Sequence, residues 1–235
     1  MPSLKLTLLS AAAALATATA NEFGPAFSTG PVSSGNFIRE STYTIVVPQA
    51  PTSSSDDLAL WIGMGTSSND LIQTIVDNTP QDGWTTFAYT LVGGTTPVSD
   101  KRTKTTAGHQ IVTHCKPLLA FHTTSFHLTY ESTDKYSDST KQYTQTVLLD
   151  GKQVSTLSTA SGQAQGWGTA VECQSSKCGT APAHKWTNAT IVMDKADPNY
   201  INTLYKSGGA TGTMKTADGG KTWTVAEISV PSYTF

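Results

Sequence analysis

The chain has 235 residues, of which 14% are charged, and its formal net charge is −2. Ordinary globular domains carry about 25% charged residues, and a strongly basic balance is the usual electrostatic footprint of nucleic-acid binding. The composition therefore argues against nucleic acid as a partner, and the length suits one large β domain or two small ones.

The first twenty residues have the pattern of a secretion signal. A single cation, Lys5, precedes an apolar stretch that is too short to span a bilayer. The stretch ends in Ala-Thr-Ala, the small-x-small pattern that signal peptidase needs. We expect residues 1–20 to be removed and Asn21 to become the new terminus, with a membrane anchor as the alternative. No later segment could span a membrane, so we expect a secreted, extracellular protein.

Apolar and polar residues alternate along nearly every segment after residue 40, which is typical of strands. Asp150-Gly151 predicts a two-residue hairpin turn, and one short helix is expected at 199–206. The predicted strands are 42–47, 57–64, 71–77, 84–91, 110–115, 126–132, 143–149, 152–157, 167–173, 189–193, 211–215 and 222–230. This series predicts an all-β fold, a two-sheet antiparallel β-sandwich. We expect residues 21–35 to form an extended lead-in and residues 36–235 a single domain.

Three cysteines in a secreted chain leave one unpaired. Cys173 and Cys178 are five residues apart, so we expect a local disulfide that closes a tight loop. Cys115 lies in an apolar strand and is expected to be a buried thiol. Asn188 begins the sequon Asn-Ala-Thr, which predicts a glycosylated surface position.

Several kinds of catalytic or metal site find no support in the sequence. It contains no nucleophile elbow, zinc-binding helix motif or glycine-rich phosphate loop. The pairs His122/His127 and His109/His114 are each five residues apart, so their members point to opposite faces of a strand. We therefore expect no metal site and no cofactor. Residues 216–223 resemble the Asp-box hairpin of propeller proteins, which is a structural turn.

The predicted strand at 71–77 places an amide and a carboxylate on one face. Because side chains alternate along a strand, Gln73 and Asp77 share a side, and Ile72, Thr74 and Val76 share the other. The second set suits a buried core. We expect the first set to lie on an open face that binds a substrate.

The strand segment LIQTIVD stands between TYTIVVPQAPTSSSDDLALWIGMG and TTAGHQIVTHC. These three motifs, with later segments at 186–192 and 222–225, resemble the fungal glutamic peptidases, the eqolisins. Each motif is short, and together they span most of residues 41–235. The resemblance implies a concanavalin A-like sandwich with a substrate groove. It also implies acid-range endopeptidase activity on polypeptides, without a cofactor.

Carried across by position, the resemblance assigns roles to residues of this chain. Gln73 matches the catalytic glutamine, and Glu172 is the candidate for the catalytic glutamate. A glutamate can act as general base on water while a glutamine N–H donates to the oxyanion. The substrate-binding candidates are Trp61, Asp77, Trp84 and Tyr89. We expect the protein to act as a monomer.

Two other functions remain open. The exposed aromatic residues expected on a sandwich would also suit a carbohydrate-binding or carbohydrate-cleaving protein. The departures from the family pattern favour a non-catalytic secreted protein on the same scaffold. Cys173 follows Glu172 where the family has tryptophan, and Gly65 stands where it has aspartate.

Overall fold

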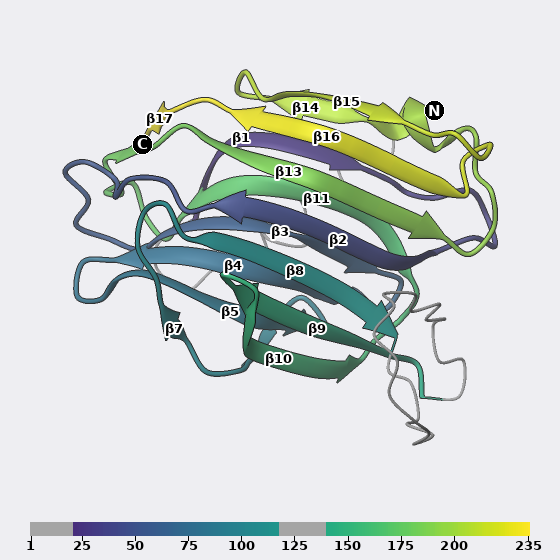
Figure 1. Ribbon diagram of the computed structural model, residues 1–235, viewed down its shortest axis with the longest axis horizontal. Coiled ribbons are helices and arrows are strands. Elements are labelled where there is room, and N and C mark those ends of the chain that lie inside the picture. The colour runs from purple at the N-terminus through teal and green to yellow at the C-terminus, as the bar shows by residue number, and fades with distance from the viewer. Residues whose placement is uncertain (1–20, 118–139) are drawn as a thin grey trace.

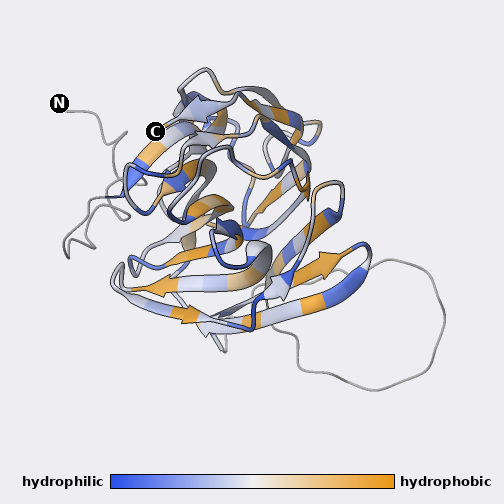
Figure 2. Cartoon of the chain, turned by 90° about the vertical axis from the view of Figure 1, so that its left-hand side faces the viewer, coloured by the Kyte–Doolittle hydropathy of each residue, from blue (hydrophilic) through white to orange (hydrophobic). Residues whose placement is uncertain are grey.

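The computed structural model describes residues 21–117 and 140–235 and consists almost entirely of antiparallel strands (Figure 1). The predicted strand at 126–132 and the predicted secretion signal lie outside these residues. Hydrophobic and hydrophilic residues alternate along the strands (Figure 2), as expected for strands with one buried face. The all-β prediction is confirmed.

The strands form two layers that share one hydrogen-bonded network. The first layer has the order β10-β9-β8-β2-β13-β16-β15. Its strands are β2 (Ile38–Val46), β8 (Gln110–Pro117), β9 (Gln142–Leu149), β10 (Lys152–Ala160), β13 (His184–Met193), β15 (Thr211–Lys215) and β16 (Thr222–Val230). Asp150 and Gly151 both have positive φ and connect β9 to β10, which is the predicted tight hairpin turn.

The second layer has the order β14-β1-β11-β3-β4-β5-β6, with β7 also paired to β5. Its strands are β1 (Glu22–Thr29), β3 (Leu58–Thr66), β4 (Leu71–Thr79), β5 (Gly83–Val92), β6 (Thr96–Ser99), β7 (Thr103–Lys104), β11 (Ala164–Cys173) and β14 (Tyr205–Ser207). β2 meets β11 at the pair Ile38–Ala164, which joins the two layers. Short strands β12 (Thr180–Ala181) and β17 (Tyr233–Thr234) pair with each other.

The core lies between the two layers. Ile62 and Ile72 of the second layer pack in one cluster with Tyr43, Val147 and residues of β13 and β16 from the first. The Tyr43 hydroxyl donates to the carbonyl of Ile62 at 3.2 Å, which links the layers by a buried hydrogen bond. This packing leaves the opposite face of the second layer free to form a site.

Two segments differ from the sequence-based expectations. The lead-in at 21–35 is extended but belongs to the sheet, because β1 pairs with both β11 and β14. The helix expected at 199–206 is only one 3-10 turn, η2 (Tyr200–Thr203), followed by strand β14. Tyr200 is buried, and its hydroxyl shares a hydrogen bond with the Thr29 hydroxyl, which holds the turn against β1.

Candidate functional site

A cavity of about 410 Å³ opens on the outer face of the second layer. Four neighbouring strands, β11, β3, β4 and β5, supply most of its walls. The lining residues are Asn21, Asp57, Ala59, Trp61, Leu71, Gln73, Ile75, Asp77, Phe87, Tyr89, Leu91, Arg102, Glu172 and Gln174. The cavity therefore combines three carboxylates and one arginine with an apolar and aromatic floor.

The alternation of β4 decides which of its side chains reach the cavity. Gln73 and Asp77 line it, while Ile72 and Val76 belong to the core between the layers. The two faces predicted from the sequence of this strand are those observed. Gln73 is only 6% exposed, since its neighbours on the sheet cover most of the side chain.

The structure corrects the assignment of Trp84. Trp84 packs in the core between the layers, whereas Tyr89 and Phe87 of the same strand line the cavity. Residues an odd number apart on a strand point to opposite faces, so Trp84 and Tyr89 could not both have faced a substrate. Phe87 and Arg102 were missed, although the same alternation places Phe87 beside Tyr89.

The strand register separates the two proposed catalytic residues. Gln73 is paired through Gly63 of β3 with Gly168 of β11. Glu172 is paired through Ala59 with Asp77. Gln73 and Glu172 are thus offset by four residues along the strand direction and by two strands across the sheet. Their Cα atoms are therefore about 16 Å apart. Both side chains line one cavity, but in the strand register Glu172 shares a row with Asp77 and not with Gln73.

Glycine is required beside Gln73 because the backbones approach closely there. A Cβ at Gly63 would lie 2.2 Å from the carbonyl oxygen of Ile72 and 2.7 Å from the Cβ of Gln73. A Cβ at Gly168 would lie 2.7 Å from the Cβ of Ser28 on β1. The positions on β3 and β11 that lie across the sheet from Gln73, Gly63 and Gly168, therefore cannot carry a larger side chain without a shift of the neighbouring strands.

Glu172 lies in a largely desolvated part of the cavity. Burial raises the pKa of its carboxyl group, and a hydrogen bond from the Asn21 side chain opposes this rise. Asn21 Nδ2 donates to Glu172 Oε1 at 2.6 Å. The Trp61 indole also favours the ionised form, although its N–H makes no hydrogen bond of normal geometry. Glu172 is thus a carboxyl group that holds its proton more tightly than usual.

Asp77 and Arg102 form an ion pair in the wall of the cavity. Asp77 also accepts a hydrogen bond from Thr85. Burial nevertheless raises the pKa of Asp77, and Thr85 and Arg102 oppose the rise. Arg102 lies over the ring of Phe87 at 4.4 Å from its centroid. Burial, followed by the charge of Asp56, likewise raises the pKa of Asp57.

Two polar atoms at the floor of the cavity have no hydrogen-bond partner among the described residues. They are the acceptor Oε1 of Gln73 and the donor Nε1 of Trp61. A buried polar atom without a partner costs about 1–3 kcal/mol. Such atoms are candidates for contacts with a bound molecule.

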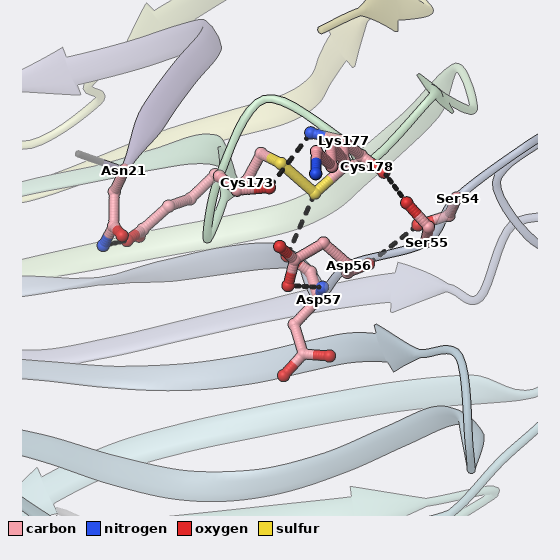
Figure 3. Close-up of a disulfide and its surroundings, with 10 residues drawn as sticks. Asn21, Ser54, Ser55, Asp56, Asp57, Cys173, Lys177 and Cys178 are labelled. Carbon is pink, nitrogen blue, oxygen red and sulfur yellow. Dashed lines mark hydrogen bonds between the residues drawn. A yellow bond between two sulfur atoms is a disulfide. The ribbon is translucent and has the colours of Figure 1, made fainter. Parts of the chain in front are cut away.

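The predicted disulfide lies beside the segment that carries Asp57 (Figure 3). Cys173 and Cys178 are bonded, and Cys115 is free and buried, so both predictions are confirmed. The sulfur of Cys178 also lies 3.1 Å from the carbonyl oxygen of Asp57. Because Cys173 follows Glu172 directly, the bridge fixes the strand end that carries Glu172 next to the segment that carries Asp57.

The other predicted sites are placed as follows. Asn188 is exposed, which leaves its sequon accessible, and its glycosylation stays a prediction. Among the described residues, no group of three or more His, Cys, Asp or Glu side chains could hold a metal ion. The same part of the chain contains no helix of the length and hydropathy needed to cross a membrane.

Comparison with solved structures identifies the fold. Two structures of scytalido-glutamic peptidase, one with a peptide-based transition state analogue and one with a transition state analogue inhibitor, superpose with a TM-score of 0.52. Each match covers 89% of this chain and 99% of the other, at 13% sequence identity. The chain shares the fold of scytalido-glutamic peptidase. SCP-B, a member of the eqolisin family crystallised with the tripeptide Ala-Ile-His, matches with a TM-score of 0.49, 13% identity and the same coverage.

The likeness to scytalido-glutamic peptidase is one of structure. No protein-family model matches the chain, and no curated protein matches its sequence. At 13% identity the comparison shows a common fold, and a common fold does not by itself carry a common activity. The function has to be argued from the cavity.

Proposed function

We propose that this chain is a secreted protein that binds an extended polypeptide segment in the cavity on its second layer. The observation that carries the proposal is the unpartnered pair at the cavity floor, Gln73 Oε1 and Trp61 Nε1. A peptide group presents one N–H donor and one C=O acceptor, which match this acceptor and this donor. The binding of peptide-based analogues by scytalido-glutamic peptidase supports the same class of ligand.

The apolar residues of the cavity suit the side chains of such a ligand. Leu71, Ile75 and Leu91 line the cavity together with the rings of Phe87 and Tyr89. An extended peptide places alternate side chains on one face, so every second side chain could contact this apolar floor. Preference for particular peptide side chains would then come from the carboxylates of the cavity.

Hydrolysis by Glu172 and Gln73 together finds less support. A general base and an oxyanion donor must both reach one carbonyl group, within about 3 Å of the reacting atoms. The register keeps these two residues in different rows, and Gly168 occupies the position on β11 that pairs through Gly63 with Gln73. We therefore infer binding without turnover in this conformation.

The proposal is tested by measuring binding and cleavage in the same samples. A pool of synthetic decapeptides is incubated with the purified protein from about pH 3 to 7, and retained and cleaved peptides are identified by mass spectrometry. We expect retention without cleavage. Gln73→Leu should weaken the binding of retained peptides about tenfold, since one hydrogen bond is lost. Gln153→Leu, at an exposed position on β10, is the matched control and should bind normally.

Two results would contradict the proposal. Retention of no peptide at any pH would remove polypeptide as the ligand. Cleavage that disappears in Glu172→Gln would replace binding with peptidase activity and assign the base to Glu172.

A second candidate function is hydrolysis of a glycan by Asp77 and Glu172. Both residues pair with Ala59, one from each side, so their Cα atoms are about 10 Å apart, and both side chains line the cavity. Glycosidases use two carboxyl groups that flank the bond to be broken at about 5–9.5 Å. The Arg102 contact favours ionised Asp77. Glu172 has no ion pair among the described residues and its pKa is raised by burial, so it would be the acid. Release of reducing sugars from fungal and plant polysaccharides, lost in Glu172→Gln, would support this candidate.

A further inference from the structure

The beginning of the described chain enters the cavity. Asn21 lines it, and its side-chain amide donates to Glu172 Oε1 at 2.6 Å. Strand β1 follows directly, and its register with β11 pairs Glu22 with Cys173 and Phe23 with Glu172. The disulfide between Cys173 and Cys178 anchors the same end of β11. Asn21 is therefore held beside Glu172 by the sheet and by its own side chain.

The sequence places a cleavage pattern at this position. Ala18-Thr19-Ala20 precedes Asn21 and has the small residues that signal peptidase requires. Hydrolysis of the Ala20–Asn21 bond consumes one water molecule, leaves a carboxylate on Ala20 and leaves an amine on Asn21. A free α-amino group has a pKa of about 7.7–8.0, so at pH 6 it carries a positive charge. In the longer chain the same nitrogen is a neutral amide.

The cavity holds more acidic groups than cations, so an added positive charge would be favourable there. The acidic groups in the cavity are Asp57, Asp77 and Glu172. Tyr89 is a further titratable group, and burial, followed by the charge of Glu172, raises its pKa. The cation that lines the cavity, Arg102, is paired with Asp77. Glu172 accepts a hydrogen bond from the side-chain amide of Asn21, which carries no charge.

We propose that removal of residues 1–20 makes the α-ammonium group of Asn21 a component of the binding cavity, where it pairs electrostatically with Glu172. Standard bond lengths place the nitrogen of Asn21 within about 8 Å of the Glu172 carboxylate, given the hydrogen bond made by its side chain. At that range a partly buried ion pair shifts the pKa of the carboxyl group by about one pH unit. Processing would then lower the pKa of Glu172, which opposes the rise caused by burial. The inference does not depend on which ligand the cavity takes.

The first part of the test is the identity of the mature terminus. The protein is expressed with its full sequence in a secreting host, and the intact mass and terminal peptide are read by mass spectrometry. We expect the secreted chain to begin at Asn21. A terminus at any other residue overturns the proposal.

The second part measures the pKa of Glu172 with and without the ammonium group. Secreted protein labelled with ¹³C at glutamate carboxyl carbons is titrated by NMR, and Glu172→Gln identifies the resonance. The mature form is compared with an N-α-acetylated form and with a form that carries Gly-Ser before Asn21. We expect the pKa of Glu172 to be about one pH unit lower in the mature form than in either blocked form.

The controls separate charge from chain length and folding. Gly-Ser added after Phe235 should leave the pKa of Glu172 unchanged. Acetylation keeps every residue in place, so it remains informative even if the Gly-Ser extension disturbs β1. Equal pKa values of Glu172 in the mature and acetylated forms would overturn the proposal.

Discussion

Asp77 and Arg102 form an ion pair in which the carboxylate is buried and the guanidinium is half exposed, with 7% and 52% of their side chains accessible. Removal of the arginine would leave a buried carboxylate without its cation, and that is strongly unfavourable. The pair thus links the shape of the cavity to the stability of the second layer.

Arg102→Met should lower the free energy of unfolding at pH 7 by about 1–3 kcal/mol, because Asp77 loses its counter-charge. The loss should shrink as the pH falls and Asp77 takes up a proton, which Arg102 opposes in the wild type. Urea unfolding at about pH 4 and 7 measures both effects. Lys104→Met, which breaks the exposed pair with Asp82, is the matched control and should cost less than about 1 kcal/mol. Equal losses in the two variants would contradict the role assigned to Arg102.

The disulfide should stabilise the protein chiefly by restricting the unfolded chain. The bridge closes a loop with a sequence separation of 5, for which the chain-entropy model gives about 2 kcal/mol. The double variant Cys173→Ala/Cys178→Ala should lose that amount in urea unfolding. Wild-type protein under reducing conditions should have the same free energy of unfolding as the double variant. A much larger loss in the variant than in the reduced wild type would point to damaged packing instead.

His184 should make the protein less stable in mild acid. The side chain is 6% exposed, packs edge-on against Trp186, and burial lowers its pKa from 6.5 to about 4. The unfolded chain therefore binds a proton at a higher pH than the folded chain. Stability from this group is complete above about pH 6.5 and is lost as the pH falls toward 4, by up to about 3 kcal/mol.

Thermal unfolding between pH 4 and 7 measures this effect. His184→Gln should flatten the pH dependence over that interval, because the titrating group is gone. An unchanged slope in His184→Gln would assign the acid sensitivity to other groups.

Gly63 should tolerate no larger residue. A Cβ would lie 2.2 Å from the backbone oxygen of Ile72, so Gly63→Ala requires β3 and β4 to move apart. We expect a loss of about 1–3 kcal/mol in the free energy of unfolding, with weaker peptide binding because Gln73 moves with β4. A stable variant that binds peptides normally would contradict the close approach.

The local properties of this protein follow from its sequence. Alternation along 71–77 separates Gln73 and Asp77 from the core residues of the same strand, because successive side chains on a strand point to opposite faces. The spacing of Cys173 and Cys178 indicates their bridge, and Asp150-Gly151 indicates its hairpin. In each case the partners are close in sequence, so local geometry is sufficient.

The composition of the cavity depends on the tertiary structure. Whether Glu172 shares a row with Gln73 or with Asp77 is set by the registers of β11, β3 and β4, strands that come from distant parts of the chain. If β11 were shifted by four residues against β4, each side chain would stay on the same face of the sheet. The sequence pattern therefore could not distinguish a pairing of Glu172 with Gln73 from a pairing with Asp77. The contact of Asn21 with Glu172 spans 151 positions and depends on the pairing of β1 with β11. Long-range register, which no local pattern encodes, decides the chemistry of this site.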